Sequence, residues 1–251
     1  MRWTSSRAGR DVLAAGESEA VSSAGKSKNA DLPIRLLSAA VMMSIAVAAV
    51  VAGDPWLDGF IVLVSLATFV EFVLLVVKVT QNVPFRLAAI LAGAVYIGLA
   101  GFVLTRLPVP MIVGVIGAVI FVDTFAYGFG RTLGGPKIAP RISPSKTWAG
   151  LLGGIVGAST WLALFVYGVA RQVSGAATLG FEIAEIGTLI ALGAVTAIAA
   201  QSGDFFESWL KRKAGVKDSS NLIPGHGGFF DRTDGIIPVV LLYGLLLSSA
   251  P

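Results

Sequence analysis

The chain has 251 residues, of which 55% are hydrophobic and only 14% are charged, and its mean hydropathy is +0.81. This composition is typical of polytopic membrane proteins and excludes a single soluble domain. The absence of cysteine excludes a disulfide framework and a thiolate metal site, and the modest net charge of +4 does not indicate nucleic acid as a partner.

The N-terminal part of the chain differs in composition from the rest. Residues 1–33 are rich in Ser, Ala, Gly and charged residues and show no helical apolar period, so we expect a disordered tail. No apolar core closely follows the first basic residues, so a signal peptide is not expected. Residues 34–251 are expected to form one integral membrane domain.

Seven apolar segments follow the tail, and most are near the roughly 20 residues that a transmembrane helix needs. We therefore predict an all-α polytopic membrane protein with about seven transmembrane helices, the last of which is the shortest. The predicted segments are 34–51, 56–77, 87–104, 109–127, 148–169, 186–202 and 236–249.

Charges in the loops predict the orientation of these segments. If the N-terminus is cytoplasmic, the loops after the second, fourth and sixth segments lie in the cytoplasm and carry most of the basic residues. Only Arg106 and Arg171 then lie on the outer side, in agreement with the positive-inside rule. We expect a protein of the inner cell membrane whose charged loops face the cytoplasm.

The most highly charged stretch, residues 203–235, lies between the last two apolar segments. It contains five acidic residues, five basic residues and the only histidine, His226. So many charges beside membrane segments are costly to place, which indicates a functional site. Carboxylates can hold Mg²⁺ and basic side chains can hold phosphates, so this stretch favours a site for a phosphorylated ligand.

The local geometry of this stretch can be predicted in part. A helix with one polar face is expected at its start, ended by Gly215, and the polar face would carry Asp204, Ser208, Lys211 and Arg212. The glycine-rich turn 224–228 would let a ligand approach the backbone closely. Asp231 and Asp234, three residues apart, would share a face if the chain turns helical there.

Two sets of motifs carry a resemblance to a known family. The first set reads Ser208-x-x-Lys211-Arg212, Lys217-Asp218, Pro224-x-His226-Gly227-Gly228 and Asp231-Arg232-x-Asp234. The second set reads Asp123, Ala126-Tyr127-x-x-Gly130-Arg131 and Ser143-Pro144-x-Lys146-Thr147-Trp148-x-Gly150. Together they resemble the phosphatidate cytidylyltransferases, also called CDP-diacylglycerol synthases. With about a dozen fixed positions, the first set is far more specific than a lone glycine motif.

The resemblance implies a nucleotidyltransferase of phospholipid biosynthesis. Such an enzyme joins CTP and phosphatidic acid, a membrane lipid, to give CDP-diacylglycerol and pyrophosphate, and residues 34–251 would form its catalytic domain. The resemblance also implies Mg²⁺, with K⁺ as a further cation beside it, and a homodimer. Because the attacking lipid phosphate is already an anion, catalysis would consist mainly of alignment and charge neutralisation.

The site residues follow from the motifs and from their chemistry. The predicted metal ligands are Asp204, Asp231 and Asp234, and the predicted catalytic residues are Asp204, Asp231, Lys211 and Arg212. The predicted substrate-binding residues are Asp123, Ser143, Lys146, Thr147, Ser208, Lys217, Asp218, His226, Gly227, Gly228 and Arg232. The segment around Ser143 and Thr147 also predicts a capped helix start, where a lysine would favour phosphate.

Other interpretations of these residues stay open at this point. The three aspartates could instead be ion-pair partners of the nearby bases. Glu71, deep in the second segment, is more readily interpreted as a carboxyl group bonded within the bundle than as a lipid-headgroup or proton site. A related transferase that acts on another lipid phosphate, or a small ion-coupled transporter, are the alternative functions.

The predicted orientation can be tested with a reporter that is active only in the cytoplasm. We expect activity when the reporter is fused after Gly135 or after Ser219, because both positions lie in loops rich in bases. An inactive reporter at either position would show that the assignment is wrong.

Overall fold

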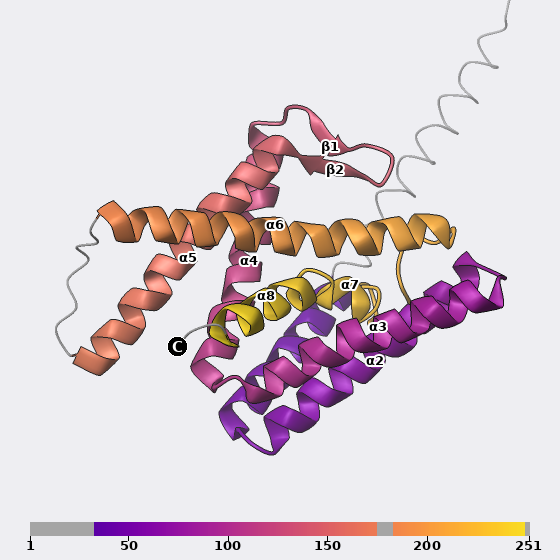
Figure 1. Cartoon of the computed structure of the whole chain (residues 1–251), viewed down its shortest axis with the longest axis horizontal. Coiled ribbons are helices and arrows are strands. Elements are labelled where there is room, and N and C mark those ends of the chain that lie inside the picture. The colour runs from indigo at the N-terminus through magenta and orange to yellow at the C-terminus, as the bar shows by residue number, and fades with distance from the viewer. Residues whose placement is uncertain (1–32, 175–182, 249–251) are drawn as a thin grey trace, which may run out of the picture.

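The computed structural model describes residues 33–174 and 183–248, which are almost entirely helical. The predicted tail lies outside the described residues, except for Pro33, which begins a helix. The elements are the N-terminal helix Pro33–Ala52, α2 Trp56–Val79, α3 Val83–Arg106, α4 Val109–Thr132, β1 Lys137–Ala139, β2 Ser143–Thr147, α5 Trp148–Ser174, α6 Ile183–Lys213, α7 Phe230–Thr233 and α8 Ile236–Ser248 (Figure 1).

The helical membrane class is confirmed, but the number of spans differs from the prediction. Within the described residues, six helices are long and apolar enough to cross a membrane, and they match the first six predicted segments. The seventh segment forms α8, which has only 13 residues. At 1.5 Å per residue it extends about 20 Å, which is short of the roughly 30 Å of a hydrocarbon core.

Between α4 and α5 the chain is not helical. β1 and β2 form an antiparallel hairpin in which Lys137 pairs with Thr147 and Ala139 pairs with Ser143. The hairpin follows the Gly134–Gly135 pair, both with positive φ, and its sequence carries prolines at positions 136, 140 and 144. Proline lacks the N–H that a helix interior needs, so this segment cannot continue α4.

The ends of the helices agree with the capping residues in the sequence. Thr147 Oγ1 accepts a hydrogen bond from Gly150 N at 3.0 Å and caps the start of α5, as the sequence predicts. Gly215, with φ of 68°, lies just beyond the end of α6, where Val216 N donates to Lys211 O at 3.0 Å. This left-handed turn ends the helix where it was expected.

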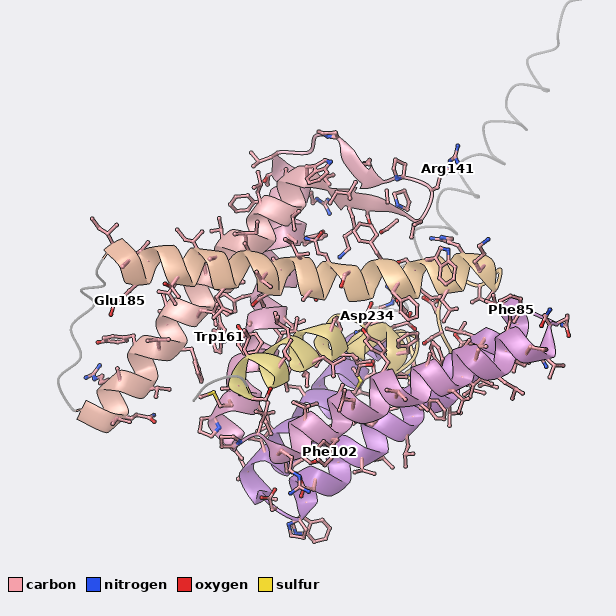
Figure 2. The ribbon with its side chains drawn as sticks, viewed as in Figure 1. Phe85, Phe102, Arg141, Trp161, Glu185 and Asp234 are labelled. Atoms are coloured by element: carbon pink, nitrogen blue, oxygen red, sulfur yellow. The ribbon has the colours of Figure 1, made fainter. Side chains whose placement is uncertain are left out.

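Helices α4 and α5 pack closely because glycines line their contact. A Cβ atom added to Gly153 or Gly157 of α5 would overlap the carbonyl oxygens of Phe125 and Phe121 on α4. Near the other end of the contact, Trp161 Nε1 donates to Gly114 O at 2.7 Å (Figure 2). Small residues at the contact let the two backbones approach, as is usual between helices in membranes.

The remaining helices enclose an apolar core and leave an apolar outer surface. The core includes Phe72 of α2, whose ring meets the Phe230 ring edge-on at a centroid distance of 5.9 Å, and the fully buried Val239 of α8. On the outer side of α3, Phe85 and Phe102 point away from the bundle (Figure 2) and are largely exposed. An outer surface of this kind suits lipid.

The polar elements gather toward one end of the molecule. In Figure 1 the hairpin lies at the top, and the turn between α2 and α3 and the end of α6 lie at the right, whereas the turn between α3 and α4 lies toward the lower left. The three loops that the sequence places on one side of the membrane are thus on one side of the fold.

The close contact of α4 and α5 gives a stability prediction. We expect Gly157→Ala to lower the free energy of unfolding by about 1–3 kcal/mol, because the new methyl group has to displace the backbone of α4. The measurement is thermal unfolding of the purified protein in detergent.

Gly168→Ala is the matched control, since it lies on the same helix and an added Cβ meets no atom within 4 Å. Equal melting temperatures for the two variants would contradict the packing described here.

Candidate active site

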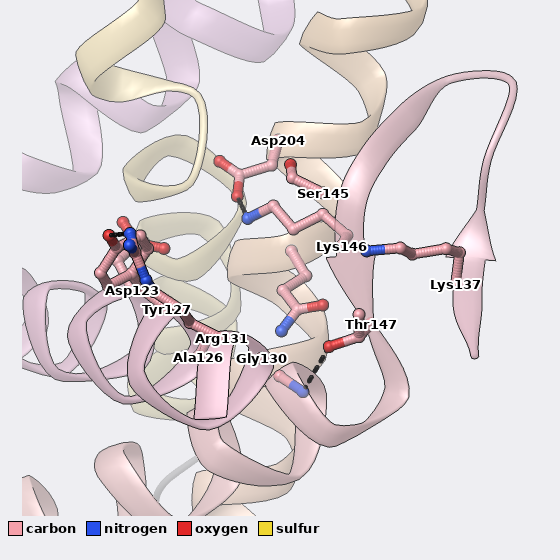
Figure 3. A pocket seen from close by; sticks show the side chains of 12 residues that line it. Asp123, Ala126, Tyr127, Gly130, Arg131, Lys137, Ser145, Lys146, Thr147 and Asp204 are labelled. Atoms are coloured by element: carbon pink, nitrogen blue, oxygen red, sulfur yellow. Dashed lines mark hydrogen bonds and ion pairs between the residues drawn. The ribbon is translucent and has the colours of Figure 1, made fainter. Parts of the chain in front are cut away.

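A pocket of about 580 Å³ opens between the hairpin, α4, the start of α5 and α6 (Figure 3). It combines residues of the second set of motifs with Asp204, one of the predicted metal ligands, whereas no residue of the first set lines it. The lining residues are Asp123, Ala126, Tyr127, Gly130, Arg131, Lys137, Ser145, Lys146, Thr147, Gly150, Gln201 and Asp204. The pocket therefore brings together residues up to 81 positions apart, from Asp123 to Asp204.

An ion pair between Lys146 and Asp204 crosses this pocket. Strand β2 carries Lys146, and Asp204 lies at the start of the last third of α6, so the pair joins the hairpin to the long helix (Figure 3). Burial by itself would lower the pKa of Lys146, but the neighbouring Asp204 outweighs it and raises the pKa above its usual value. Lys146 is therefore protonated at neutral pH.

A second carboxyl group, that of Asp234, lies beside Asp204. Gly203 makes this possible, because a Cβ at that position would overlap the carbonyl oxygen of Asp234. Burial, followed by the negative charge of Asp204, raises the pKa of Asp234 well above its usual value. Figure 2 shows Asp234 between α6 and the elements that follow it.

The neighbouring carboxyl groups of Asp204 and Asp234 fit a divalent cation in their chemistry. The negative charge of Asp204 contributes to the raised pKa of Asp234, and a cation such as Mg²⁺ would offset the charge that the two carboxyl groups share. Residues 33–174 and 183–248 contain no group of three or more Asp, Glu, His or Cys side chains that is arranged to hold a metal ion. The sequence predicted that three aspartates come together, and the structure brings two of them, Asp204 and Asp234, next to each other.

Asp231, the third of these aspartates, has other partners. Its Oδ1 accepts from Lys211 Nζ at 2.6 Å, and Lys211 also pairs with Glu207 Oε2 at 2.7 Å. Burial alone would raise the pKa of Asp231, but hydrogen bonds, including those with Glu207, Lys211 and Ser219, hold it below the usual value. The chain is helical at 230–233, which was the condition for the two aspartates to share a face, yet Asp231 and Asp234 meet different partners.

The glycine-rich turn is fixed by backbone and side-chain contacts. Gly225 and Gly227 have positive φ, and Ile223 and Gly227 form a β-bridge. Arg232 Nη2 donates to His226 O at 2.8 Å, while His226 Nδ1 lies 2.8 Å from Ser38 Oγ of the N-terminal helix. The turn is therefore attached both to α7 and to the first helix.

Several of the predicted site residues take no part in these hydrogen bonds and ion pairs. In the described ranges, the side chains of Ser208, Arg212, Lys217 and Asp218 make no hydrogen bond or ion pair, and Arg212, Lys217 and Asp218 are exposed. Ser143 is buried in the hairpin, where its residue pairs with Ala139. These residues stay predictions.

The structure also adds residues that the sequence reasoning missed. Glu207 joins the polar face of α6 beside Lys211, and its i,i+4 spacing from that lysine was the available signal. Gln201 lies one turn before Asp204 and is only 3% exposed on the pocket wall. Glu71 is buried and hydrogen-bonded within the bundle, as the favoured interpretation held.

Comparison with known proteins finds related sequences. A family model described as the cytidylyltransferase family matches residues 106–250. A phosphatidate cytidylyltransferase of Rickettsia felis is 31% identical over 217 residues, which is 85% of this chain and 92% of the relative. One from Brucella melitensis biotype 1 is 43% identical over 120 residues, and one from Haemophilus influenzae is 40% identical over 119 residues.

The extent of these matches differs between relatives. The match spans 48% of this chain but only 40% of the Brucella protein, and 38% of the Haemophilus protein. The similarity to the Brucella and Haemophilus proteins thus covers only part of their length, whereas the Rickettsia felis protein is matched along nearly all its length.

Proposed function

This chain belongs to the cytidylyltransferase family, and we propose that it joins CTP and phosphatidic acid to form CDP-diacylglycerol and pyrophosphate. The name phosphatidate cytidylyltransferase, printed for several relatives, supports these substrates. The observation that carries the proposal is the pocket in which a lysine of the hairpin meets an aspartate of α6, at the polar end of a membrane bundle.

The chemistry suits the charges in and beside the pocket. An oxygen of the lipid phosphate attacks the α-phosphorus of CTP, a new P–O bond forms, and the bond to the β-phosphate oxygen breaks as pyrophosphate leaves. Lys146 and Lys211 would bind phosphate oxygens and offset the negative charge that gathers as the two substrates meet. No strong general base is required, because the attacking phosphate is already an anion.

Mg²⁺ would be held by Asp204 and Asp234, whose carboxyl groups are neighbours, with Asp231 as the further predicted ligand. When bound, the metal would neutralise phosphate charge and help to orient the reacting groups. The protein itself holds the hairpin lysine against α6 and leaves the pocket open to the polar end of the fold. We also propose that a K⁺ ion binds beside Mg²⁺, as the family resemblance implies.

The proposed enzyme also has an orientation in the membrane, a route for its lipid substrate and an oligomeric state. The site would face the cytoplasm, where CTP is found, and this orientation rests on the loop charges. The lipid substrate would arrive from the membrane around the apolar outer surface, and the active form would be the homodimer that the resemblance implies.

The decisive experiment is to incubate the purified protein with phosphatidic acid and labelled CTP and to separate the lipid products. Formation of a labelled liponucleotide with release of pyrophosphate supports the proposal. Parallel reactions with other lipid phosphates distinguish a related transferase, and the absence of any labelled lipid would refute nucleotidyl transfer.

The role of Lys146 gives a second prediction. Replacing Lys146 by Met removes a positive charge from the pocket, so we expect a loss of turnover on the order of 10²–10³, as for a charge-stabilising contact in a transition state. Turnover and the KM for CTP are measured on folded protein. Lys211→Met should also lose activity, but it removes as well the positive charge with which both Glu207 and Asp231 pair.

Lys78→Met serves as the control, because Lys78 is exposed in the last turn of α2, away from the pocket. It should retain the rate of the wild-type protein. Normal activity in both Lys146→Met and Lys211→Met would remove these lysines from the site.

The metal prediction concerns Asp204, Asp234 and Asp231. Asn keeps the shape of Asp but lacks its charge, so each Asp→Asn variant should need more Mg²⁺ for half-maximal activity and lose rate on the order of 10²–10³ at limiting Mg²⁺. EDTA should abolish wild-type activity, and Mg²⁺ should restore it.

Asp58→Asn is the matched control, since Asp58 lies in the first turn of α2. Near-normal rates of Asp204→Asn and Asp231→Asn in limiting Mg²⁺ would mean that these carboxylates are only ion-pair partners. The metal would then have to be held elsewhere.

A further inference from the structure

Glu71 is a buried carboxylate that lies outside the pocket and on a different helix from the predicted site residues. It belongs to the middle of α2 and is only 3% exposed. It also lies outside residues 106–250, which the family model matches. A carboxylate placed this deep in an apolar bundle has to be met by donors, so its partners are informative.

The partners of Glu71 all come from the segment 219–230, which joins α6 to α8. Oε1 accepts from Ser220 Oγ at 2.6 Å and from Phe229 N at 3.1 Å. Oε2 accepts from Ser219 Oγ at 3.0 Å and from Phe230 N at 2.8 Å. Each oxygen thus receives one serine hydroxyl and one backbone N–H, so both ends of the segment are attached to the same side chain.

One of these contacts, that with Ser219, leads directly to Asp231. Ser219 Oγ also lies 2.7 Å from Asp231 Oδ2, which accepts from Ser219 N and from Gly228 N at 2.9 and 2.8 Å. The other oxygen of Asp231 holds Lys211. A continuous series of contacts therefore runs from Glu71 through Ser219 and Asp231 to the lysine of α6.

The close approach of Glu71 also accounts for a glycine of the motif. A Cβ at Gly228 would overlap both Glu71 Oε2 and Ser219 Oγ. Only glycine leaves space for the carboxylate at this position. The second glycine of the His-Gly-Gly sequence is thus required by a residue of α2, 157 positions earlier in the chain.

We propose that Glu71 is a positioning residue, which holds the segment 219–230 in the conformation that places Asp231 and Lys211 at the site. This inference rests on the proposed function, because only that function makes Asp231 and Lys211 part of an active site. The contacts of Glu71 do not depend on it. Glu71 acts through Ser219 and the backbone of Phe229 and Phe230, and it does not line the pocket.

A residue that only stabilises the fold would behave differently. Its loss would reduce the amount of folded protein and leave each folded molecule fully active, with an unchanged segment 219–230. Loss of a positioning residue changes that segment and the kinetic constants of molecules that are still folded. The two roles are therefore separated by measurements on folded, monodisperse protein.

The principal variant is Glu71→Gln, in which an amide NH₂ replaces one carboxylate oxygen and faces donors that it cannot satisfy. We expect amide hydrogen exchange in residues 219–230 to accelerate by about tenfold or more, because hydrogen bonds to a charged group are lost. We expect kcat/KM for CTP to fall by about tenfold or more as well. Glu71→Asp, which keeps the charge, should recover part of both losses.

Leu75→Ala is the matched control, because Leu75 is fully buried one turn further along α2 and belongs to the apolar core. This change should lower the melting temperature while the kinetic constants and the exchange of residues 219–230 stay as in the wild type. Ser220→Ala removes a single donor and keeps the test available if Glu71→Gln does not fold. It should shift exchange and kcat/KM in the same direction, by less.

The proposal is overturned if Glu71→Gln and Ser220→Ala retain wild-type exchange in residues 219–230. It is equally overturned if their kcat/KM per folded molecule equals that of the wild type. A wild-type protein that makes no liponucleotide would refute the proposed function instead, and the exchange measurement would then decide alone whether Glu71 holds this segment.

Discussion

Carboxylates buried among apolar helices impose the strongest constraint on this structure. A charge removed from water costs several kcal/mol unless donors or an opposite charge compensate for it. Glu71 and Glu207 are only 3% and 2% exposed, and they are compensated in different ways. Glu71 receives four hydrogen bonds from one connecting segment, whereas Glu207 pairs with Lys211 at 2.7 Å. Because the donors to Glu71 come from a distant part of the chain, satisfying this carboxylate draws α2 and the segment after α6 together.

The same constraint assembles the candidate site at the polar end of the fold. Lys146 reaches from the hairpin to Asp204 of α6, and Lys211 reaches from α6 to Asp231 of α7. Each contact joins two elements, so site and tertiary structure are stabilised by the same interactions. Glycine occurs where these elements come closest, as at Gly203 and Gly228, because any side chain there would separate the groups that have to meet.

In the proposed reaction, this balance of charges has a consequence for the substrates. Both lysines of the site are already neutralised by carboxylates, so the phosphates of CTP and of the lipid would compete with aspartates for the same ammonium groups. Carboxylates released from lysine are then available to a divalent cation. Substrate and metal would therefore bind cooperatively. The phosphates would pair with the lysines, and the cation would pair with the carboxylates that the lysines release.

Much of the local structure could be predicted from short stretches of sequence. The six long helices follow from runs of apolar residues, the start of α5 from Thr147 and the end of α6 from Gly215. The hairpin and α8 are the exceptions. Prolines prevent the hairpin segment from being helical, and α8 is apolar but too short to match the predicted seventh span. Capping, turn chemistry and helical period act over a few neighbouring residues, so they can be recognised without a structure.

The sequence by itself determined the class of the protein, the family resemblance and which side chains are chemically suited to phosphate and metal. Only the tertiary structure decided which of them meet: Lys146 with Asp204, 58 positions apart, and Glu71 with Phe230, 159 positions apart. It also separated Asp231 from the Asp204–Asp234 pair. The physical reason is that such contacts depend on how distant helices pack and on which buried charge finds which donor, and neither is encoded in the spacing of residues along the chain.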